Sequence, residues 1–519
     1  MNAKRVSRDS RDGLRLNRDD RMPLQRQIYM RIRTAIEQRR LQPGERVSSV
    51  RALASELGVA RGTVEAAYQQ LTGEGYLLAR GQAGTVVSPH LPVVPEPTTT
   101  AAVAPARGRG NNRVRASVPQ EPPLITSVPS QPLPSTLPPP FQLGMPALDA
   151  FPRKTWTRLA ARRMRTLQLS DLAYGDPSGH APLRQAIATY LLVSRGIACT
   201  PEQVVVTAGY RASLALVARM LLRKGERVWV EDPCHPPTRD VLAAAEVVPV
   251  GVPVDAQGLV VEYGMRRAPK ARMAIVTPSH QAPLGVSLAL PRRLQLLDWA
   301  SRADAWIVED DYDGEYHYSG PPLPALKNLD AHDRVIYAGS FSKTLYPGLA
   351  LGYLVLPERL ADAGRATARR WSHGPAPFMQ AIVADFVVAG HFSRHLKKMR
   401  LLYARRRTLL VAALAATFGD KVSVELTSGG MHLIARFKSP LDDLELAHRA
   451  QRAGLNCQSL SARYAMPGDD QGLLIGFTNV ASPDEAARLC TRLRDALDAR
   501  ATGHSSSSSS RRSSPAASA

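Results

Sequence analysis

The segments WIVEDDYDGEY (residues 306–316) and VIYAGSFSKT (residues 335–344) decide the fold of the main part of this chain. Each begins with a short apolar, β-prone run and passes directly into polar side chains. Similar runs alternate with helical patterns, such as 212–222 and 292–300, between residues 183 and 356; the runs are 204–207, 228–230, 273–276, 306–308 and 335–337. This alternation predicts an α/β body with a mostly parallel central sheet covered on both faces. Because ligands bind beyond the carboxyl ends of such strands, we expect the site residues there.

Three of these strand ends carry residues that suit pyridoxal 5′-phosphate (PLP). Lys343 can form a Schiff base with the cofactor, and Asp310 can keep its ring nitrogen protonated. Tyr312 can hydrogen-bond the ring hydroxyl. The phosphate can be bound by the hydroxyls of Ser340 and Ser342 and by the backbone amides of the helix-opening turn Gly209-Tyr210-Arg211. No GxGxxG motif follows a strand, and the lysine segment lacks the glycine spacing of a P-loop. Spacing alone leaves a second interpretation open, in which these acids and this lysine form structural ion pairs.

Length and composition set the broad class. A chain of 519 residues exceeds one ordinary domain, and 44% apolar with 22% charged residues is typical of a globular protein. The sequence has neither a membrane-spanning apolar run nor a signal peptide at its start. The four cysteines are too scattered for a zinc site or a disulfide framework. We therefore expect a cytoplasmic protein without a metal site, and the net charge of +22 favours polyanionic partners.

Composition divides the chain into four parts. Residues 89–140 are rich in proline and are expected to form a semi-extended linker. The basic patch at 107–115 within it suits either contact with DNA phosphates or simple solvation. The predicted parts are a basic head (1–88), the linker, a body (141–500) and a disordered serine-rich tail (501–519).

The head has the pattern of a winged helix. Apolar residues recur every fourth position over 24–36, and Pro43-Gly44 must end that helix. A short serine-capped helix over 48–57, a turn at Gly58 and a second amphipathic helix form a helix-turn-helix, whose second helix enters the major groove of DNA. Residues 76–87 are a candidate β-hairpin.

The segment from Pro23 to Val87 resembles the GntR winged-helix domain. The shared landmarks are PG (43–44), SVRALA (49–54), LGV (57–59), RGTV (61–64), AY (67–68), EGY (74–76) and GTVV (84–87). The resemblance implies that Arg51, Arg61 and Thr63 approach duplex DNA and that a wing from Arg80 to Gly84 follows the minor groove. Ala60 replaces the usual serine before Arg61, and loss of that cap weakens the helix start by about 1 kcal/mol.

The body together with the head resembles the MocR-type regulators, in which a GntR head is joined to a fold type I aminotransferase-like body. The shared strings are YGDPSG (174–179), TPSHQ (277–281), EDDYDGEY (309–316) and GSFSK (339–343). The resemblance implies a PLP-binding homodimer. It implies Lys343 as the Schiff-base lysine, Asp310 as the partner of the ring nitrogen and Tyr312 beside the ring hydroxyl. Ser340, Ser342 and the turn Gly209-Tyr210-Arg211 would hold the phosphate.

Four positions depart from that pattern. Ala350 stands where the family usually has a phosphate-binding arginine, and Arg211 replaces the usual glutamine and could restore that charge. His235 replaces the tyrosine over the cofactor, and Leu284 replaces the threonine of a Pro-Thr-Gly element. Losing one charge-assisted hydrogen bond costs roughly 1.5–3 kcal/mol, so we expect weakened cofactor binding. Arg463 suits either the carboxylate of an effector or a solvated surface charge.

Three functions remain open on the sequence. The leading hypothesis is a transcriptional regulator that binds a DNA operator and senses a small amino compound, or PLP itself, through its body. An active aminotransferase with a vestigial head is the second hypothesis, and the intact Lys343 and Asp310 keep it open. The third is a regulator whose cofactor site has decayed, as the changes at Ala350, His235 and Leu284 suggest.

Overall fold

The computed structural model describes residue 16 and residues 24–37, 40–73, 76–79, 84–88, 138–318, 324–371, 374–438, 442–465 and 470–498. The basic patch of the linker, the serine-rich tail and Arg80 at the tip of the wing lie outside these residues.

The head is a three-helix domain with a β-hairpin, as its sequence pattern predicts. Its helices are α1 (Leu24–Glu37), α2 (Val50–Leu57) and α3 (Arg61–Gly73), and its antiparallel strands are β1 (Leu77–Ala79) and β2 (Thr85–Val87). The Ser49 hydroxyl accepts a hydrogen bond from the amide of Ala52 and caps α2. Gly58 ends this helix in a left-handed conformation that glycine adopts without strain.

The centre of the body is an eight-stranded sheet. Its strand order is β3-β10-β9-β8-β7-β4-β5-β6, and only the pairings of β10 and β6 are antiparallel, which confirms the mostly parallel sheet. The strands are β3 (Val204–Thr207), β4 (Arg227–Asp232), β5 (Val248–Asp255), β6 (Gly258–Leu259), β7 (Met273–Val276), β8 (Trp306–Asp311), β9 (Val335–Ser340) and β10 (Gly352–Val355).

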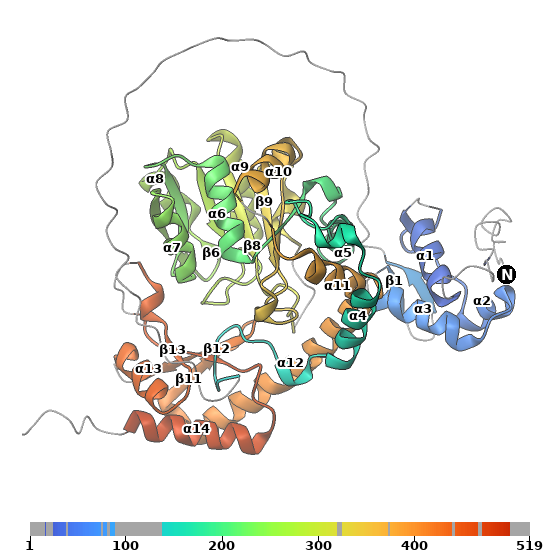
Figure 1. Ribbon diagram of the computed structural model, residues 1–519. Helices are drawn as coiled ribbons and strands as arrows, with labels where there is room; N and C mark the ends of the chain where they lie inside the picture. The colour runs from blue at the N-terminus through green and yellow to red at the C-terminus, as the bar shows by residue number, and fades with distance from the viewer. Residues whose placement is uncertain are drawn as a thin grey trace, which may run out of the picture.

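Helices cover both faces of this sheet (Figure 1). One face packs against α6 (Tyr210–Leu221), α7 (Pro236–Ala244) and α10 (Ala361–Trp371). The other packs against α5 (Ala181–Ser194), α8 (Val261–Arg267), α9 (Leu290–Arg302) and α11 (Pro377–Val388). Burial on both faces explains why the central strands appear in the sequence as unbroken apolar runs.

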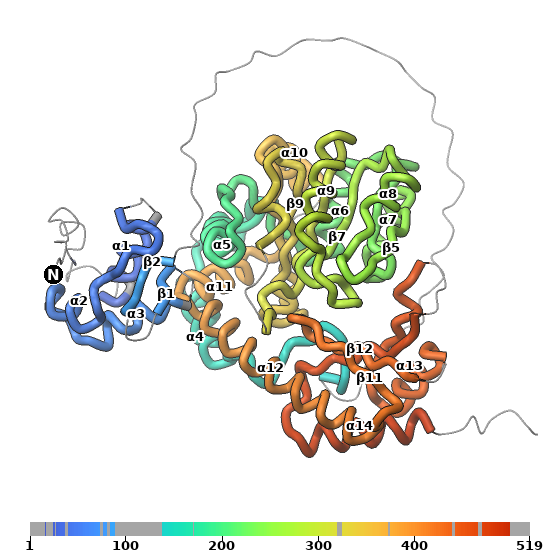
Figure 2. Tube along the Cα trace, turned by 180° about the vertical axis from the view of Figure 1, so that it is seen from behind, coloured from blue at the N-terminus to red at the C-terminus, as the bar shows by residue number. Residues whose placement is uncertain are grey.

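A smaller antiparallel sheet follows the large one in the chain. The long helix α12 (His391–Phe418) runs from α11 beside the large sheet into the small domain, and α4 (Arg153–Arg165) packs against α11, as Figure 2 shows from behind. The small sheet has the order β11-β12-β14-β13 and packs with two helices. Its elements are β11 (Val422–Glu425), β12 (His432–Phe437), α13 (Asp443–Arg452), β13 (Gln458–Ser459), β14 (Leu473–Gly476) and α14 (Pro483–Asp498).

Two strands of the large sheet are longer than their apolar runs predict. β8 continues through Glu309 and Asp310 to Asp311, and β9 continues to Ser340, because the two strands pair along this whole length. The acidic residues therefore form the last part of a buried strand and do not follow it. All four cysteines are free, and no metal-binding group of three or more ligand side chains occurs among the described residues. In the same part of the chain no helix is long and apolar enough to cross a membrane.

Candidate cofactor site and nucleic-acid interface

The pairing of three strands brings two predicted phosphate-binding segments to one edge of the sheet. Gly352 at the start of β10 pairs with Thr207 of β3 on one side and with Ser340 of β9 on the other. Gly209 follows β3 with a φ of +92°, and its Cα lies 3.0 Å from the position that a Cβ on Gly352 would take. Gly209 precedes α6, whose first backbone amides have no acceptor within the helix. This edge therefore combines free amides with the Ser340 hydroxyl.

Lys343 lies just beyond β9, at the same edge. Its Nζ donates a hydrogen bond of 3.0 Å to the carbonyl oxygen of Gly144, and a Cβ on Gly144 would collide with it. Burial lowers the pKa of Lys343, although the carboxylates of Asp313 and Asp310 act in the opposite direction. Because only the neutral amine attacks a carbonyl carbon, this lowered pKa favours Schiff-base chemistry.

Asp310 is a buried carboxyl group beside Lys343. It is 8% exposed, and its side chain makes no hydrogen bond to any residue that the structure describes. Burial raises its pKa well above the usual range, and repulsion from Asp311 and Asp313 adds to this effect. The charged form of such a carboxyl group is stabilised when a cation or a hydrogen-bond donor approaches it.

Tyr312 belongs to a connected group of polar side chains. Its hydroxyl lies 2.9 Å from Nδ1 of His280, which also lies 3.3 Å from Oδ2 of Asp313. On the other side of the ring, Nε2 lies 3.4 Å from the Thr427 hydroxyl. The sequence pattern gives His280 no role, although this residue stands in the TPSHQ string.

His235 and Arg211 stand at the opening of this site. The surrounding atoms and repulsion from Lys343, Arg463 and Arg211 lower the pKa of His235 to about 4, although its side chain is exposed to solvent. Arg211 is directed to the surface, where its guanidinium forms an exposed ion pair of 3.2 Å with Asp240. The Tyr210 hydroxyl lies 2.8 Å from that of Thr238, which fixes the ring between α6 and α7.

Arg463 joins the small domain to the large one. Its carbonyl oxygen accepts hydrogen bonds from the Cys234 amide (3.2 Å) and from the Arg239 guanidinium (3.0 Å), and its own guanidinium donates to Gln458. Because the Cys234 amide, next to His235, bonds the Arg463 carbonyl, His235 and Arg463 lie close together at the boundary of the two domains.

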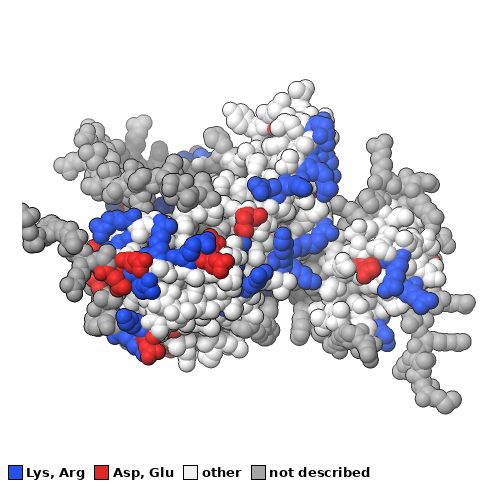
Figure 3. Space-filling view, turned by 90° about the horizontal axis from the view of Figure 1, so that it is seen from below, with Lys and Arg blue, Asp and Glu red and all other residues white. Residues whose placement is uncertain are grey.

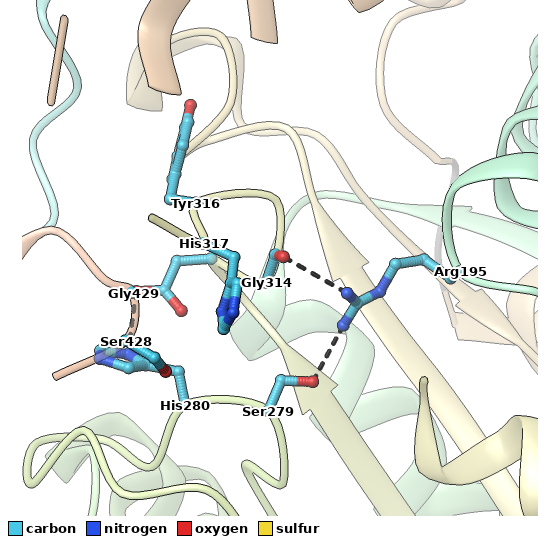
Figure 4. Close-up of a pocket in the computed structure, with 9 residues that line it drawn as sticks. Arg195, Ser279, His280, Gly314, Tyr316, His317, Ser428 and Gly429 are labelled. Atoms are coloured by element: carbon cyan, nitrogen blue, oxygen red, sulfur yellow. Dashed lines mark hydrogen bonds and ion pairs between the residues drawn. The ribbon is translucent and has the colours of Figure 1, made fainter. Parts of the chain in front are cut away.

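A small cavity lies behind His280. It has a volume of about 20 Å³ and is lined by Arg195, Ser279, His280, Asp313, Gly314, Tyr316, His317, Ser428 and Gly429. Figure 4 shows the Arg195 guanidinium directed at Ser279 and Gly314 on one side of this cavity, with hydrogen bonds of 2.9 and 3.3 Å. This volume suits one water molecule and not a cofactor.

The predicted DNA-contacting residues of the head differ in exposure. Arg51 and Arg61 stand in the first turns of α2 and α3 and are exposed, whereas Thr63 is half-buried. Gly84 begins the return strand of the hairpin with a φ of +88°, and a Cβ there would meet the guanidinium of Arg46 at 2.9 Å. Arg46 therefore joins the candidate DNA surface, and the sequence pattern did not single it out.

Comparison with known proteins identifies both parts of the chain. Residues 24–87 match the family of bacterial regulatory proteins, gntR family, and residues 149–495 match aminotransferase class I and II. A probable rhizopine catabolism regulatory protein, MocR, from Rhizobium meliloti is 38% identical over 90% of this chain and 92% of its own length. The chain belongs to the MocR-type regulators.

Further relatives agree with this assignment. The pyridoxine biosynthesis transcriptional regulator PdxR of Corynebacterium glutamicum is 34% identical over 89% of this chain and 93% of its own length. Among solved structures, a kynurenine aminotransferase from Pyrococcus horikoshii, in complex with PMP, aligns with a TM-score of 0.63 and 26% identity. That alignment covers 69% of this chain and 90% of the aminotransferase. The body therefore has the fold type I aminotransferase architecture, and the chain is a helix-turn-helix transcriptional regulator, not a metabolic enzyme.

Two departures from the MocR-type pattern have visible surroundings. Ala350 lies exposed before β10 in a left-handed conformation with a φ of +48°. Leu284 packs with apolar residues of the small domain, namely Ile434, Leu460 and Leu474. An aliphatic residue at position 284 therefore has a packing role that the usual threonine would fill less well.

The described residues fit PLP. The buried Asp310 carboxyl forms no ion pair with a described residue, and a protonated pyridine nitrogen would supply the missing cation. The charge of the Lys343 amine acts on the same carboxyl. The cofactor would act as an electron sink at this position. The Tyr312 hydroxyl and the free amides before α6 are the remaining groups that its substituents require.

His395 supports the lysine segment and makes unfolding pH-dependent. Its imidazole is 6% exposed and lies 3.0 Å from the carbonyl oxygen of Thr344, next to Lys343. Burial lowers the folded-state pKa of His395 to about 4, below the 6.5 of a histidine in contact with water. The unfolded chain therefore binds the proton first, and stability present above pH 6.5 is lost as the pH falls toward 4.

We expect the wild-type protein to lose about 2 kcal/mol more stability than His395→Gln between pH 7 and pH 5. Glutamine keeps a donor for the Thr344 carbonyl but does not titrate. Urea unfolding at the two pH values measures the difference. Equal losses of stability in the two proteins would show that His395 does not cause the pH dependence of unfolding.

Proposed function

We propose that this regulator binds PLP covalently through Lys343 and senses a small amino compound, or PLP itself, by a change in its DNA affinity. The observation that carries the proposal is the buried Asp310 carboxyl, which forms no ion pair with a described residue, at the same sheet edge as the half-buried Lys343, in a chain that also has a gntR-family head. An amino compound would compete with Lys343 for the same carbonyl carbon of the cofactor. Displacement of Lys343 would change the DNA affinity only if the effector binds the two conformations of the regulator with different affinities.

The proposed roles follow the geometry of the site. Asp310 would pair with the ring nitrogen, and Tyr312, oriented by His280, would hydrogen-bond the ring hydroxyl. Ser340, Ser342 and the amides of Gly209, Tyr210 and Arg211 would bind the phosphate. His235 would cover the ring as a neutral imidazole. Arg463, half-buried at the domain boundary, would bind an acidic group of the effector.

We also propose that the regulator acts as a homodimer. The segment between α4 and α5 exposes large apolar side chains, since Leu169, Leu172 and Tyr174 are 87%, 68% and 96% exposed. Adjacent apolar side chains of this size are typical of a surface that a partner covers. A dimer also suits two half-sites on duplex DNA.

Titration of PLP and a panel of amino compounds into a complex of the protein with DNA tests the sensing function. The DNA is a duplex selected from a random pool with the purified protein. A change in affinity that requires PLP and follows one class of amine supports the proposal. An unchanged affinity with every compound would favour the regulator with a decayed site.

We expect Arg61→Ala to weaken binding of this selected duplex by about 1–3 kcal/mol, roughly 5- to 150-fold, because the exposed guanidinium opens the recognition helix. Fluorescence anisotropy at fixed salt measures the effect. Arg302→Ala, which removes an exposed arginine at the end of α9, is the control. An equal effect of the two substitutions would reject the role of Arg61.

A further inference from the structure

Two helices of the body carry many basic residues and no acidic residue. α4 has six arginines and lysines in 13 residues, and α12 has seven in 28 residues. The whole chain has 67 basic and 45 acidic residues, so the absence of acids from these two helices is not a consequence of average composition.

Only some of these cations have partners within the protein. Arg162 and Arg163 form ion pairs with Asp385, and the buried Arg406 pairs with Asp149 at 2.5 Å. The other exposed cations form no ion pair with any acidic residue that the structure describes. We call them the basic face: Arg153, Lys154, Arg158, Arg165, Arg394, Lys397, Lys398, Arg400 and Arg405.

The two halves of the basic face meet at the start of α12. The pKa of His391 is lowered by burial and then by repulsion from Arg394 of its own helix and Arg158 of α4. The Arg394 guanidinium lies 3.0 Å from Nδ1 of His391, and α4 and α12 both pack against α11, which brings the two sets of cations to the same end of α12. From Arg394 to Arg405 the exposed cations of α12 extend along roughly 16 Å at 1.5 Å per residue, about the length of five base pairs.

The head contacts the body at the same point. A Cβ on Gly390, directly before α12, would meet the Gln70 side chain of α3 at 2.7 Å. Arg33 of α1 donates a hydrogen bond of 3.0 Å to the Thr189 hydroxyl of α5, and Val193 packs against the core of the head. Figure 3 shows Lys and Arg side chains gathered between the head and the small domain, where α4 and α12 lie in Figure 1.

We propose that the basic face binds the phosphate backbone of duplex DNA and extends the contact made by the head. This inference rests on the proposed DNA binding by the head. Lysine and arginine bind phosphates without reading base sequence, so the expected contribution is to affinity and salt dependence. Duplex DNA is the polyanion that the adjacent head would bring to this surface, and an acidic protein partner is an alternative that the experiment distinguishes.

The experiment compares three full-length proteins on one labelled duplex of random sequence, about 60 base pairs long. They are the wild type, the variant Arg394→Gln/Lys397→Gln/Lys398→Gln and the control Arg266→Gln/Arg267→Gln/Lys270→Gln. The control removes the same charge from an exposed position around the end of α8, on the far side of the large sheet from the head (Figure 1). Affinity is measured by anisotropy between about 50 and 200 mM KCl.

We expect the slope of log affinity against log salt to fall by about 2–3 in the α12 variant and to stay unchanged in the control, since each neutralised phosphate contributes about 0.9. An unchanged slope in the α12 variant, or an equal fall in the control, would overturn the inference while DNA binding by the head stands. The same slope together with a changed oligomeric mass would assign the basic face to protein association. Failure of the wild type to bind any duplex would reject the proposed function itself.

Discussion

Lys343→Ala is expected to abolish covalent binding of PLP while leaving the head able to bind DNA. Lys343 is half-buried, loss of hydration lowers the pKa of its amine, and the charge of the amine acts on the Asp310 carboxyl. In the wild type it would attack the cofactor aldehyde, form the C=N bond and release water. Alanine removes the nitrogen, so the absorbance band of the Schiff base is lost after dialysis.

The experiment records absorbance spectra of the two proteins after addition of PLP and dialysis. Lys421→Ala, at an exposed lysine before β11, is the control and should keep the band. DNA affinity measured on the same samples separates the two halves of the function. A band that persists in Lys343→Ala would place the Schiff base on another lysine, and no band in the wild type would favour the decayed site.

The arrangement of the large sheet could be predicted because its central strands are buried on both faces. Met273 to Val276 and Val335 to Tyr337 are apolar at every position, which identifies them without knowledge of their partners. The small sheet escaped prediction, because β13 has two residues and β11 alternates between half-buried and exposed positions. Neither strand carries a run long enough to distinguish it from a loop.

The candidate site was predicted where its residues are close in sequence. Asp310 and Tyr312 share one strand end, and Ser340 to Lys343 share another, so sheet topology alone places them together. His280 could not be assigned in this way, because its contact with Tyr312 depends on the turn after β7. Arg46 reaches the wing through a bridge to Val86, which no local pattern indicates.

A third residue that sequence reasoning missed is Arg195, at the end of α5. Its guanidinium lies 2.5 Å from Oδ2 of Asp311, and both side chains are less than 5% exposed. The Tyr337 hydroxyl donates a hydrogen bond of 2.5 Å to the same oxygen. Burial raises the pKa of Glu309 and of Glu315 to about 7, with repulsion from Asp311 next, and the charge of Arg195 lowers both. Arg195 is thus a buried cation close to several buried acids.

Arg195→Met is therefore expected to lower the free energy of unfolding by about 3–5 kcal/mol, because it leaves Asp311 buried without its cation. Urea unfolding at pH 7 measures the loss. Lys224→Met removes one partner of the exposed pair Lys224–Glu246, of similar length at 3.0 Å, and should cost less than about 1 kcal/mol. Equal costs for the two substitutions would show that the buried pair contributes no more than a surface pair.

The double variant Arg195→Met/Asp311→Leu distinguishes lost pairing from lost packing. If the cost of Arg195→Met comes from an uncompensated charge on Asp311, removing that carboxylate should restore part of the stability, and the two substitutions will not be additive. If the cost comes from the cavity left by the arginine, the second substitution adds its own loss. Asp311 is the neighbour of Asp310 in β8, so recovery in the double variant would also bear on the cofactor site. In that case the ion pair between Arg195 and Asp311 allows two consecutive aspartates to end the buried strand β8. The other aspartate, Asp310, forms no ion pair with a described residue and would be available to a cationic ring nitrogen.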